Sequence, residues 1–488
     1  MALESITLNG NVGFMTSNSF SEESAAPVAS QPAPETIEAL RARVHSDFER
    51  TVAQLIELAK IPGVAWDAFD PVHLDRSAEA VAELIRSVGV DDVQILREAK
   101  SDGSPGGPAV VARKKAAPGK PTILLYAHHD VQPPGDSTLW NSVPFEPVEK
   151  DGRLWGRGVA DDKAGVMAHI SSLRAVNEVL GADFGVGVTL FIEGEEEAGS
   201  PTFRNFLERH QELLRADVIV VADSANWKVG VPALTTSLRG VLDAVIQVDV
   251  LDHSVHSGMF GGPILDAPTQ LVRLLATLHD DEGSVAIDGL IQAAEPEIDY
   301  DEAGFRADAS VLPGLALSGK GSISSRLWTQ PALSVTGIDA PAVAVASNTL
   351  LSRASAKVSM RLSPGQDPQA AMDALAQHVE NHAPKTAKVT FIPGEKGSAF
   401  ATDTAAPAAQ SMLWALQTAW GVNPVEAGLG GSIPFIADLT ELYPDAQILI
   451  TGVEDPDSRA HSANESLHLA EFEKAVLAEA LLLTKLNS

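Results

Sequence analysis

Acidic residues and histidines gather in five short segments of the sequence, several of them directly after a predicted buried strand. The segments are His128-His129-Asp130, Asp161-Asp162-Lys163, Glu195-Glu196-Glu197, Asp223 and His461. Each segment alone has an ordinary explanation, such as a solvated turn, a surface histidine or a helix cap. Together they supply imidazole nitrogen and carboxylate oxygen, the ligands that divalent metals take in a protein without thiolates. The pattern therefore predicts a metal site built from converging side chains.

Buried strands are expected to position these side chains. Residues 122–126, 186–192 and 217–222 are largely apolar runs, and each leads into one of the polar segments. A helix is expected over 161–179, with acids in its first turn, where the helix dipole favours them. Strands and helices in this order predict an α/β fold with an open mixed sheet flanked by helices. Ligand sites in such sheets lie beyond the carboxyl ends of the strands. Further helices are expected from residue 35 and at 77–88, 411–420 and 465–486, and further strands at 93–96, 109–112 and 447–451.

The sequence pattern changes after Gly240. Residues 241–250 alternate between apolar and polar types, as in a strand with one exposed face. We expect residues 240–399 to form a smaller α+β domain inserted into a catalytic domain of residues 35–239 and 400–488. Its expected helices are 269–279 and 368–382, and its further expected strands are 343–345 and 356–362.

Composition narrows the class of protein. The 488 residues include no cysteine, which excludes thiolate zinc sites, iron–sulfur clusters and a cysteine nucleophile. The net charge of −30 argues against a nucleic-acid partner, because binding phosphates requires a basic surface. Apolar runs fall short of the roughly 18 residues of a membrane span. Residues 1–34 lack the features of a secretory signal, so we expect a flexible extension on a cytoplasmic protein.

Eight segments resemble, in order, the motifs of a known metallopeptidase family. They are YAHHDVQP (126–133), LWGRGVADDKAG (154–165), EGEEEAGS (193–200), the strand end 220–223, HSGMFGG (256–262), SMRL (359–362), GGSIP (430–434) and AHSANE (460–465). The family is the two-metal aminopeptidase-like group of cytosolic dipeptidases, carnosinases, aminoacylases and glutamate carboxypeptidases. Three of the motifs, HHDVQPP, ADDKAG and HSGMFGG, are closest to the dipeptidase and carnosinase branch.

The resemblance implies two divalent metal ions per chain. It pairs Asp223 with His128 on one metal and Glu197 with His461 on the other, and it makes Asp161 the bridging carboxylate. Zinc is the first expectation, with Mn²⁺ or Co²⁺ as alternatives, since His and carboxylate sites accept all three.

Neighbouring residues receive supporting roles. Asp130 would orient His128, because strand alternation places residues i and i+2 on the same side. Asp162 would cap the following helix. His129 and Glu195 are expected to be bystanders.

The resemblance also implies a catalytic apparatus. Glu196 would be the general base that takes a proton from an activated water and passes it to the leaving amine. His256 would stabilise the oxyanion from the inserted domain of a partner subunit, which implies a homodimer. Arg361, Ser432 and Gly431 would bind the free carboxylate of the substrate.

The expected activity is hydrolysis of the peptide bond in dipeptides or short peptides with a free C-terminal carboxylate. An N-acyl-amino-acid deacylase or a carboxypeptidase on the same site is the first alternative. An inactive binding protein of the same fold is a remote one.

Overall fold

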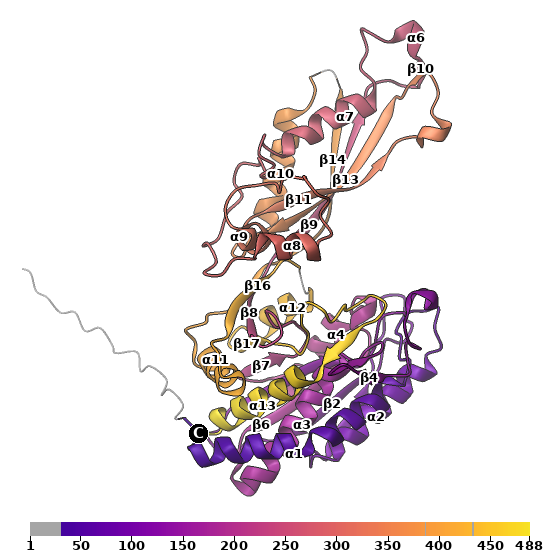
Figure 1. Ribbon diagram of the computed structural model, residues 1–488. Coiled ribbons are helices and arrows are strands. Elements are labelled where there is room, and N and C mark those ends of the chain that lie inside the picture. The colour runs from indigo at the N-terminus through magenta and orange to yellow at the C-terminus, as the bar shows by residue number, and fades with distance from the viewer. Residues whose placement is uncertain (1–30, 386, 432–433) are drawn as a thin grey trace, which may run out of the picture.

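The computed structural model describes residues 31–385, 387–431 and 434–488. A mixed sheet of nine strands occupies its larger part, in the order β1-β2-β6-β3-β7-β17-β8-β15, with β16 paired to β8 (Figure 1). The strands are β1 (Asp92–Leu96), β2 (Ala109–Lys114), β3 (Thr122–His128), β6 (Gly187–Glu193), β7 (Val218–Val221), β8 (Ala233–Leu238), β15 (Phe400–Ala401), β16 (Val425–Leu429) and β17 (Gln447–Ile450).

The centre of this sheet is parallel. Strand β3 pairs in parallel with β6 and with β7, and β7 pairs in parallel with β17. The carboxyl ends of these four strands therefore meet at one edge of the sheet. Every residue of β6 and β7 is buried, which explains why both strands read as continuous apolar runs in the sequence. The predicted open mixed sheet flanked by helices is confirmed.

Helices cover both faces of the large sheet. Along β3, Ile123 and Leu125 enter the core of one face, whereas Leu124 and Tyr126 enter the core of the other, as strand alternation requires. The first face carries α1 (Pro34–Ala59), α2 (Val72–Arg86), α3 (Lys163–Leu180), α11 (Pro407–Trp420) and α13 (Leu469–Leu486). The second face carries α4 (Phe203–Arg209), α5 (Gln211–Leu214) and α12 (Pro434–Leu442).

A second, antiparallel sheet stands apart from the first (Figure 1). Its order is β11 (Ala332–Asp339), β13 (Arg353–Leu362), β9 (Gly240–Asp249) and β14 (Lys388–Gly397). Alternate residues of β9 are buried against helices α7 (Ala267–Leu275) and α10 (Pro368–His382). The surrounding elements are β10 (Val255–His256), α6 (Ser257–Phe260), β12 (Thr349–Leu350), α8 (Glu302–Asp308) and α9 (Ile323–Trp328).

Two neighbouring segments join the sheets. The chain leaves the large sheet between β8 and β9 and returns between β14 and β15, where Phe400 pairs with Leu238. A Cβ atom on Gly240 would lie 2.8 Å from the carbonyl oxygen of Gly397 and 2.9 Å from the amide nitrogen of Ala399. Glycine at position 240 thus lets the two crossing segments pass in close contact.

A small third sheet was missed from the sequence. It contains β18 (Ser466–His468), β5 (Arg153–Trp155) and β4 (Val148–Lys150). The helix predicted over 465–486 therefore begins only at Leu469, because the preceding residues pair with β5. This pairing joins segments that are distant in the sequence.

One predicted strand is wrong. Residues Val343–Val345 form a 3₁₀ turn, in which the side chain of Val343 is 94% exposed. Valine favours strands only where it can pack on a neighbour, and here it faces solvent. The expected extension over residues 1–34 lies almost wholly outside the described residues. Among those described, we find no helix that combines the length and the apolar composition needed to cross a membrane.

Candidate metal centre

The predicted metal ligands meet at the carboxyl edge of the parallel strands. His128 is the last residue of β3, and Asp223 follows β7 by two residues. Glu196 and Glu197 lie in a 3₁₀ turn, Glu196–Ala198, that follows β6. The remaining two ligands come from loops, since Asp161 precedes α3 and His461 lies between β17 and β18.

Asp161 lies between the two histidines. Its Oδ1 atom is 3.1 Å from Nε2 of His128, and its Oδ2 atom is 3.0 Å from Nε2 of His461. His461 Nε2 also lies 3.3 Å from Oε2 of Glu197. Two groups of side chains could each hold a metal ion, with ligand atoms within 4.8 Å of one another: His128, Glu196 and Asp223, and His128, Asp161 and Glu197.

Three acids of this cluster, Glu196, Glu197 and Asp223, are unusually costly to ionise. Burial raises the pKa of Glu196 and Glu197 to about 8 and that of Asp223 to about 6, and neighbouring carboxylates add to each shift. The hydrogen bond to Asp161 raises the pKa of His461 to about 9. Oε1 of Glu197 is buried and has no hydrogen-bond partner among the described residues. A set of imidazole and carboxylate groups with this excess of negative charge fits divalent cations.

Asp130 connects two parts of the site. Its Oδ1 atom lies 3.4 Å from Nδ1 of His128. The same carboxylate accepts hydrogen bonds from the amide nitrogens of Glu196 at 3.2 Å and Glu197 at 3.0 Å. Burial alone would lower the pKa of His128, but its bonds to Asp130 and Asp161 raise that pKa well above the usual value. Asp130 therefore fixes both the imidazole and the turn that carries the two glutamates.

The neighbouring acids and histidine have structural partners. Nε2 of His129 lies 2.8 Å from the carbonyl oxygen of Pro108, and burial lowers the pKa of His129 to about 4. Glu195 accepts hydrogen bonds from the amide nitrogens of Gly107 at 2.6 Å and Thr202 at 2.9 Å. Both side chains tie loops together and point to partners other than the metal cluster.

The prediction that Asp162 caps a helix is wrong. Helix α3 begins at Lys163, so neither acid lies in its first turn, and the Asp162 side chain bonds no amide of the helix. It accepts a hydrogen bond from the amide nitrogen of His128 at 3.1 Å instead. A Cβ atom on Gly165 would lie 2.2 Å from Oδ1 of Asp162 and 2.7 Å from the carbonyl oxygen of Ala222. Glycine 165 thus allows the start of α3 to pack directly under the ligand-bearing strand ends.

The other predicted site residues come from different elements than the metal ligands. His256 is exposed on β10, at the end of the second sheet farthest from the large sheet (Figure 1). Arg361 lies on β13 opposite Val241 of β9. Gly431 follows β16, and Ser432 lies outside the described residues.

Sequence reasoning missed several residues beside the site. The indole Nε1 of Trp66 donates to the carbonyl oxygen of Glu197 at 3.1 Å, and Nε2 of Gln132 donates to Oε2 of Glu197 at 2.6 Å. Gln132 belongs to a quoted motif, whereas nothing in the sequence around Trp66 indicated a role. Nε of Arg239 donates to the carbonyl oxygen of Gly430 at 3.0 Å, and burial together with the charge of Arg361 lowers the Arg239 pKa to about 10.

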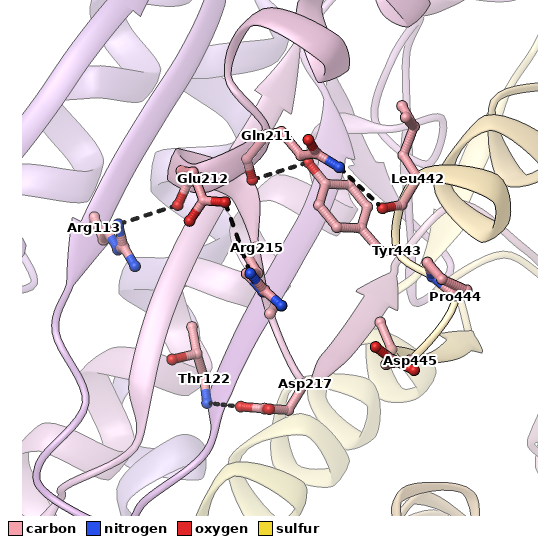
Figure 2. A pocket seen from close by; sticks show the side chains of 12 residues that line it. Arg113, Thr122, Gln211, Glu212, Arg215, Asp217, Leu442, Tyr443, Pro444 and Asp445 are labelled. Atoms are coloured by element: carbon pink, nitrogen blue, oxygen red, sulfur yellow. Dashed lines mark hydrogen bonds and ion pairs between the residues drawn. The ribbon is translucent and has the colours of Figure 1, made fainter.

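A separate hollow of about 610 Å³ lies at the opposite edge of the large sheet (Figure 2). Thr122 opens β3 there, and its amide nitrogen donates to Oδ2 of Asp217 at 2.7 Å. Arg113 and Arg215 face Glu212 in the same hollow. The residues that line it form none of the metal-capable groups found among the described residues. The candidate site is therefore the carboxyl edge, where open α/β sheets bind their ligands.

Comparisons with known proteins show the family of the chain. The sequence model of Peptidase family M20/M25/M40 matches residues 124–485. The chain belongs to this family. It is 35% identical to the cysteinylglycine-S-conjugate dipeptidase of Corynebacterium striatum, an alignment that covers 84% of this chain and 90% of the relative. It is 29% identical to the beta-Ala-His dipeptidase of Rattus norvegicus, over 85% of this chain and 89% of the relative.

Solved structures share the M20 fold. Human carnosine dipeptidase 1 superposes with a TM-score of 0.72 at 24% identity, over 93% of this chain and 100% of that one. The predicted membership in the dipeptidase and carnosinase branch of this metallopeptidase family is confirmed.

Proposed function

We propose that this M20 chain is a metallo-dipeptidase that hydrolyses the peptide bond of dipeptides or short peptides with a free C-terminal carboxylate. The arrangement of Asp161 between His128 and His461 carries the proposal, with three further carboxylates at the same strand edge. Two curated relatives named as dipeptidases support the substrate class.

Two divalent cations, zinc by preference, would bind at this cluster. His128 and Asp223 would hold one, Glu197 and His461 the other, and Asp161 would contact both. The cations would supply Lewis acidity and lower the pKa of the attacking water. Their positive charge would also offset the mutual repulsion of the buried acids.

Glu196 would transfer the proton released by the attacking water. Its amide is held by Asp130, and burial raises the pKa of its carboxyl to about 8, towards the range in which a general base works at neutral pH. Glu196 would accept a proton from the attacking water and deliver it to the departing amine. Asp130 would keep the turn in place during this transfer.

The segment 240–399 would form a lid and dimerisation domain within a catalytic domain of residues 35–239 and 400–488. His256 would act in the site of the partner subunit of a homodimer and stabilise the oxyanion. Its position on β10, far from the metal cluster of its own chain, favours such an arrangement (Figure 1). Exposed apolar side chains in this segment, including Met259, Val343 and Val345, support a protein contact there.

The substrate carboxylate would be bound by Arg361, Ser432 and Gly431. A planar guanidinium suits bidentate pairing with a carboxylate. We further propose that the protein acts in the cytoplasm without a nucleic-acid partner, for which the net charge of −30 is the supporting observation.

A panel of Xaa-Xaa dipeptides and N-acetylated amino acids tests the activity. The zinc-loaded protein should cleave dipeptides with the higher kcat/KM. Faster cleavage of the acetylated compounds would assign a deacylase instead. Metal analysis of the same preparation should find two metals per chain, and a protein that takes up none would rule out the metal mechanism.

A further inference from the structure

Glu465 has a buried carboxylate that accepts hydrogen bonds from four donors. Its Oε2 atom accepts from Nη1 of Arg157 at 2.7 Å and from the amide of Gly158 at 3.0 Å. Its Oε1 atom accepts from the amides of Ala160 at 2.9 Å and Asp161 at 3.2 Å. The side chain of Glu465 has no exposed surface. The loop that presents Asp161 is therefore wrapped around this one carboxylate.

Arg157 also links the Asp161 loop to two other segments of the chain. Its Nη2 atom donates to the carbonyl oxygens of Ser462 at 3.2 Å and Pro133 at 3.4 Å. Ser462 is the residue after His461, and Pro133 follows the strand end that bears His128. The Arg157 side chain is 2% exposed, so its ion pair with Glu465 is shielded from water.

Backbone pairing reinforces the connection. Ser466 of β18 lies opposite Trp155 of β5, and the amide nitrogen of Gly156 donates to the carbonyl oxygen of Glu465 at 3.0 Å. The segment that carries His461 and the segment that carries Asp161 are thus joined at both backbone and side-chain level.

The two histidines depend on this connection unequally. His128 ends a buried strand, and 1% of its side chain is exposed. The side chain of His461 is 61% exposed, and Arg459, His461 and Asn464 all adopt positive φ values in its loop. His461 lies in the loop between β17 and β18, so its position relative to Asp161 depends on how the end of that loop is fixed.

We infer that Arg157 and Glu465 form a positioning pair that holds Asp161 and His461 in register, so that losing the pair weakens metal binding selectively at the position formed by Glu197 and His461. The inference rests on the proposed assignment of metal ligands. Groups that orient metal ligands from behind typically contribute about 10- to 100-fold in metal affinity. The position formed by His128 and Asp223 shares Asp161 but keeps its other two ligands at strand ends, so its affinity should change much less.

Zinc titration of chelator-stripped full-length protein tests this inference, with Glu465→Gln as the first variant. The wild-type chain should bind two equivalents. In the variant, one equivalent should keep its affinity within a few-fold, and the other should weaken by about 10- to 100-fold. Metal content after dialysis should fall towards one per chain. Arg157→Lys, which keeps the charge but cannot span both partners, should act in the same direction.

Asp47→Asn is the matched control. Asp47 pairs with Arg174 at 2.5 Å between α1 and α3, so its loss removes another largely buried ion pair without touching a ligand-bearing loop. The control should lower the melting temperature and leave both affinities unchanged. Unaltered zinc binding in both pair variants, or an equal loss at both positions, would overturn the inference. A wild-type chain that binds no zinc would instead overturn the proposed function.

Discussion

The imidazole Nε2 of His461 lies 3.0 Å from Oδ2 of Asp161, although one residue belongs to the last loop of the large sheet and the other precedes its central helix. This contact joins the C-terminal part of the chain to the ligands on β3 and β6. A site assembled in this way requires both N-terminal and C-terminal strands of the large sheet to be in place.

Replacing Glu196 by Gln should separate metal binding from turnover. The amide cannot accept a proton, so kcat should fall by about 10²- to 10⁴-fold while the metal content stays at the wild-type level. Glu195→Gln is the matched control for register, because Glu195 bonds Gly107 and Thr202 and is assigned no step in the reaction. The control should lose thermal stability and keep kcat within a few-fold. If Glu195→Gln were the inactive variant, the assignment of the base would be wrong by one residue.

Mixing two inactive variants tests the role of His256 across subunits. His256→Ala and Glu196→Gln chains should each be nearly inactive alone. In a mixed dimer the Glu196→Gln chain supplies its His256 to the other chain, whose own Glu196 is intact. After subunit exchange, a 1:1 mixture should recover about a quarter of wild-type activity. No recovery, despite mixed dimers seen by native mass spectrometry, would place His256 in its own site or outside catalysis.

The buried pair of His169 and Glu479 should make stability depend on pH. Nδ1 of His169 lies 2.8 Å from Oε2 of Glu479, between α3 and α13. Burial alone would lower the pKa of His169, but the charge of Glu479 and the hydrogen bond to it raise this pKa above its ordinary value of 6.5. The folded state then binds the proton more tightly than the unfolded state, so the stabilisation is present below that ordinary value. It is lost as the pH rises through the raised pKa.

Urea unfolding of the wild type and Glu479→Gln at several pH values measures this effect. Breaking a buried pair costs about 3–5 kcal/mol. The difference in free energy of unfolding should be largest below the ordinary histidine pKa of 6.5 and should shrink as the pH rises through the raised pKa. A difference that is constant from pH 6 to pH 9 would show that the imidazole is not charged in the folded protein.

Gly165→Ala should disturb the support beneath the metal ligands. The added methyl group would meet Oδ1 of Asp162, whose carboxylate bonds the amide of His128, and the backbone carbonyl oxygen of Ala222 just after β7. We expect a loss of about 1–3 kcal/mol in stability, together with weaker zinc binding. Gly337→Ala is the control, since no atom lies within 4 Å of its added Cβ. Equal effects of both substitutions would contradict the close approach at Gly165.

The sequence was sufficient for the large sheet because its central strands are buried on both faces. The predicted runs 122–126 and 186–192 correspond to Thr122–His128 and Gly187–Glu193, and each polar segment follows directly. The exposed turn around Val343 and the small sheet of β4, β5 and β18 were harder to predict. Alternating Ala and Val around Val343 resembles a strand, but nothing in the sequence shows that the residue faces solvent.

The residues that support the site were harder to predict from the sequence than the metal ligands. Glu465 lay within a recognised motif, yet its partners Arg157 and Ala160 are distant in sequence, and only the fold brings them together. The sequence predicts a capping role for Asp162 because acids commonly precede a helix. In the structure its carboxylate instead accepts a hydrogen bond from the buried amide nitrogen of His128.

The narrow crossing at Gly240 has a consequence for how the protein can vary. Leu238 and Phe400 are paired neighbours, so the chain leaves and re-enters the large sheet through a single gap. Insertions between them need not alter any strand that carries a metal ligand. The strands that carry the metal ligands can therefore stay the same while the length and composition of this segment change.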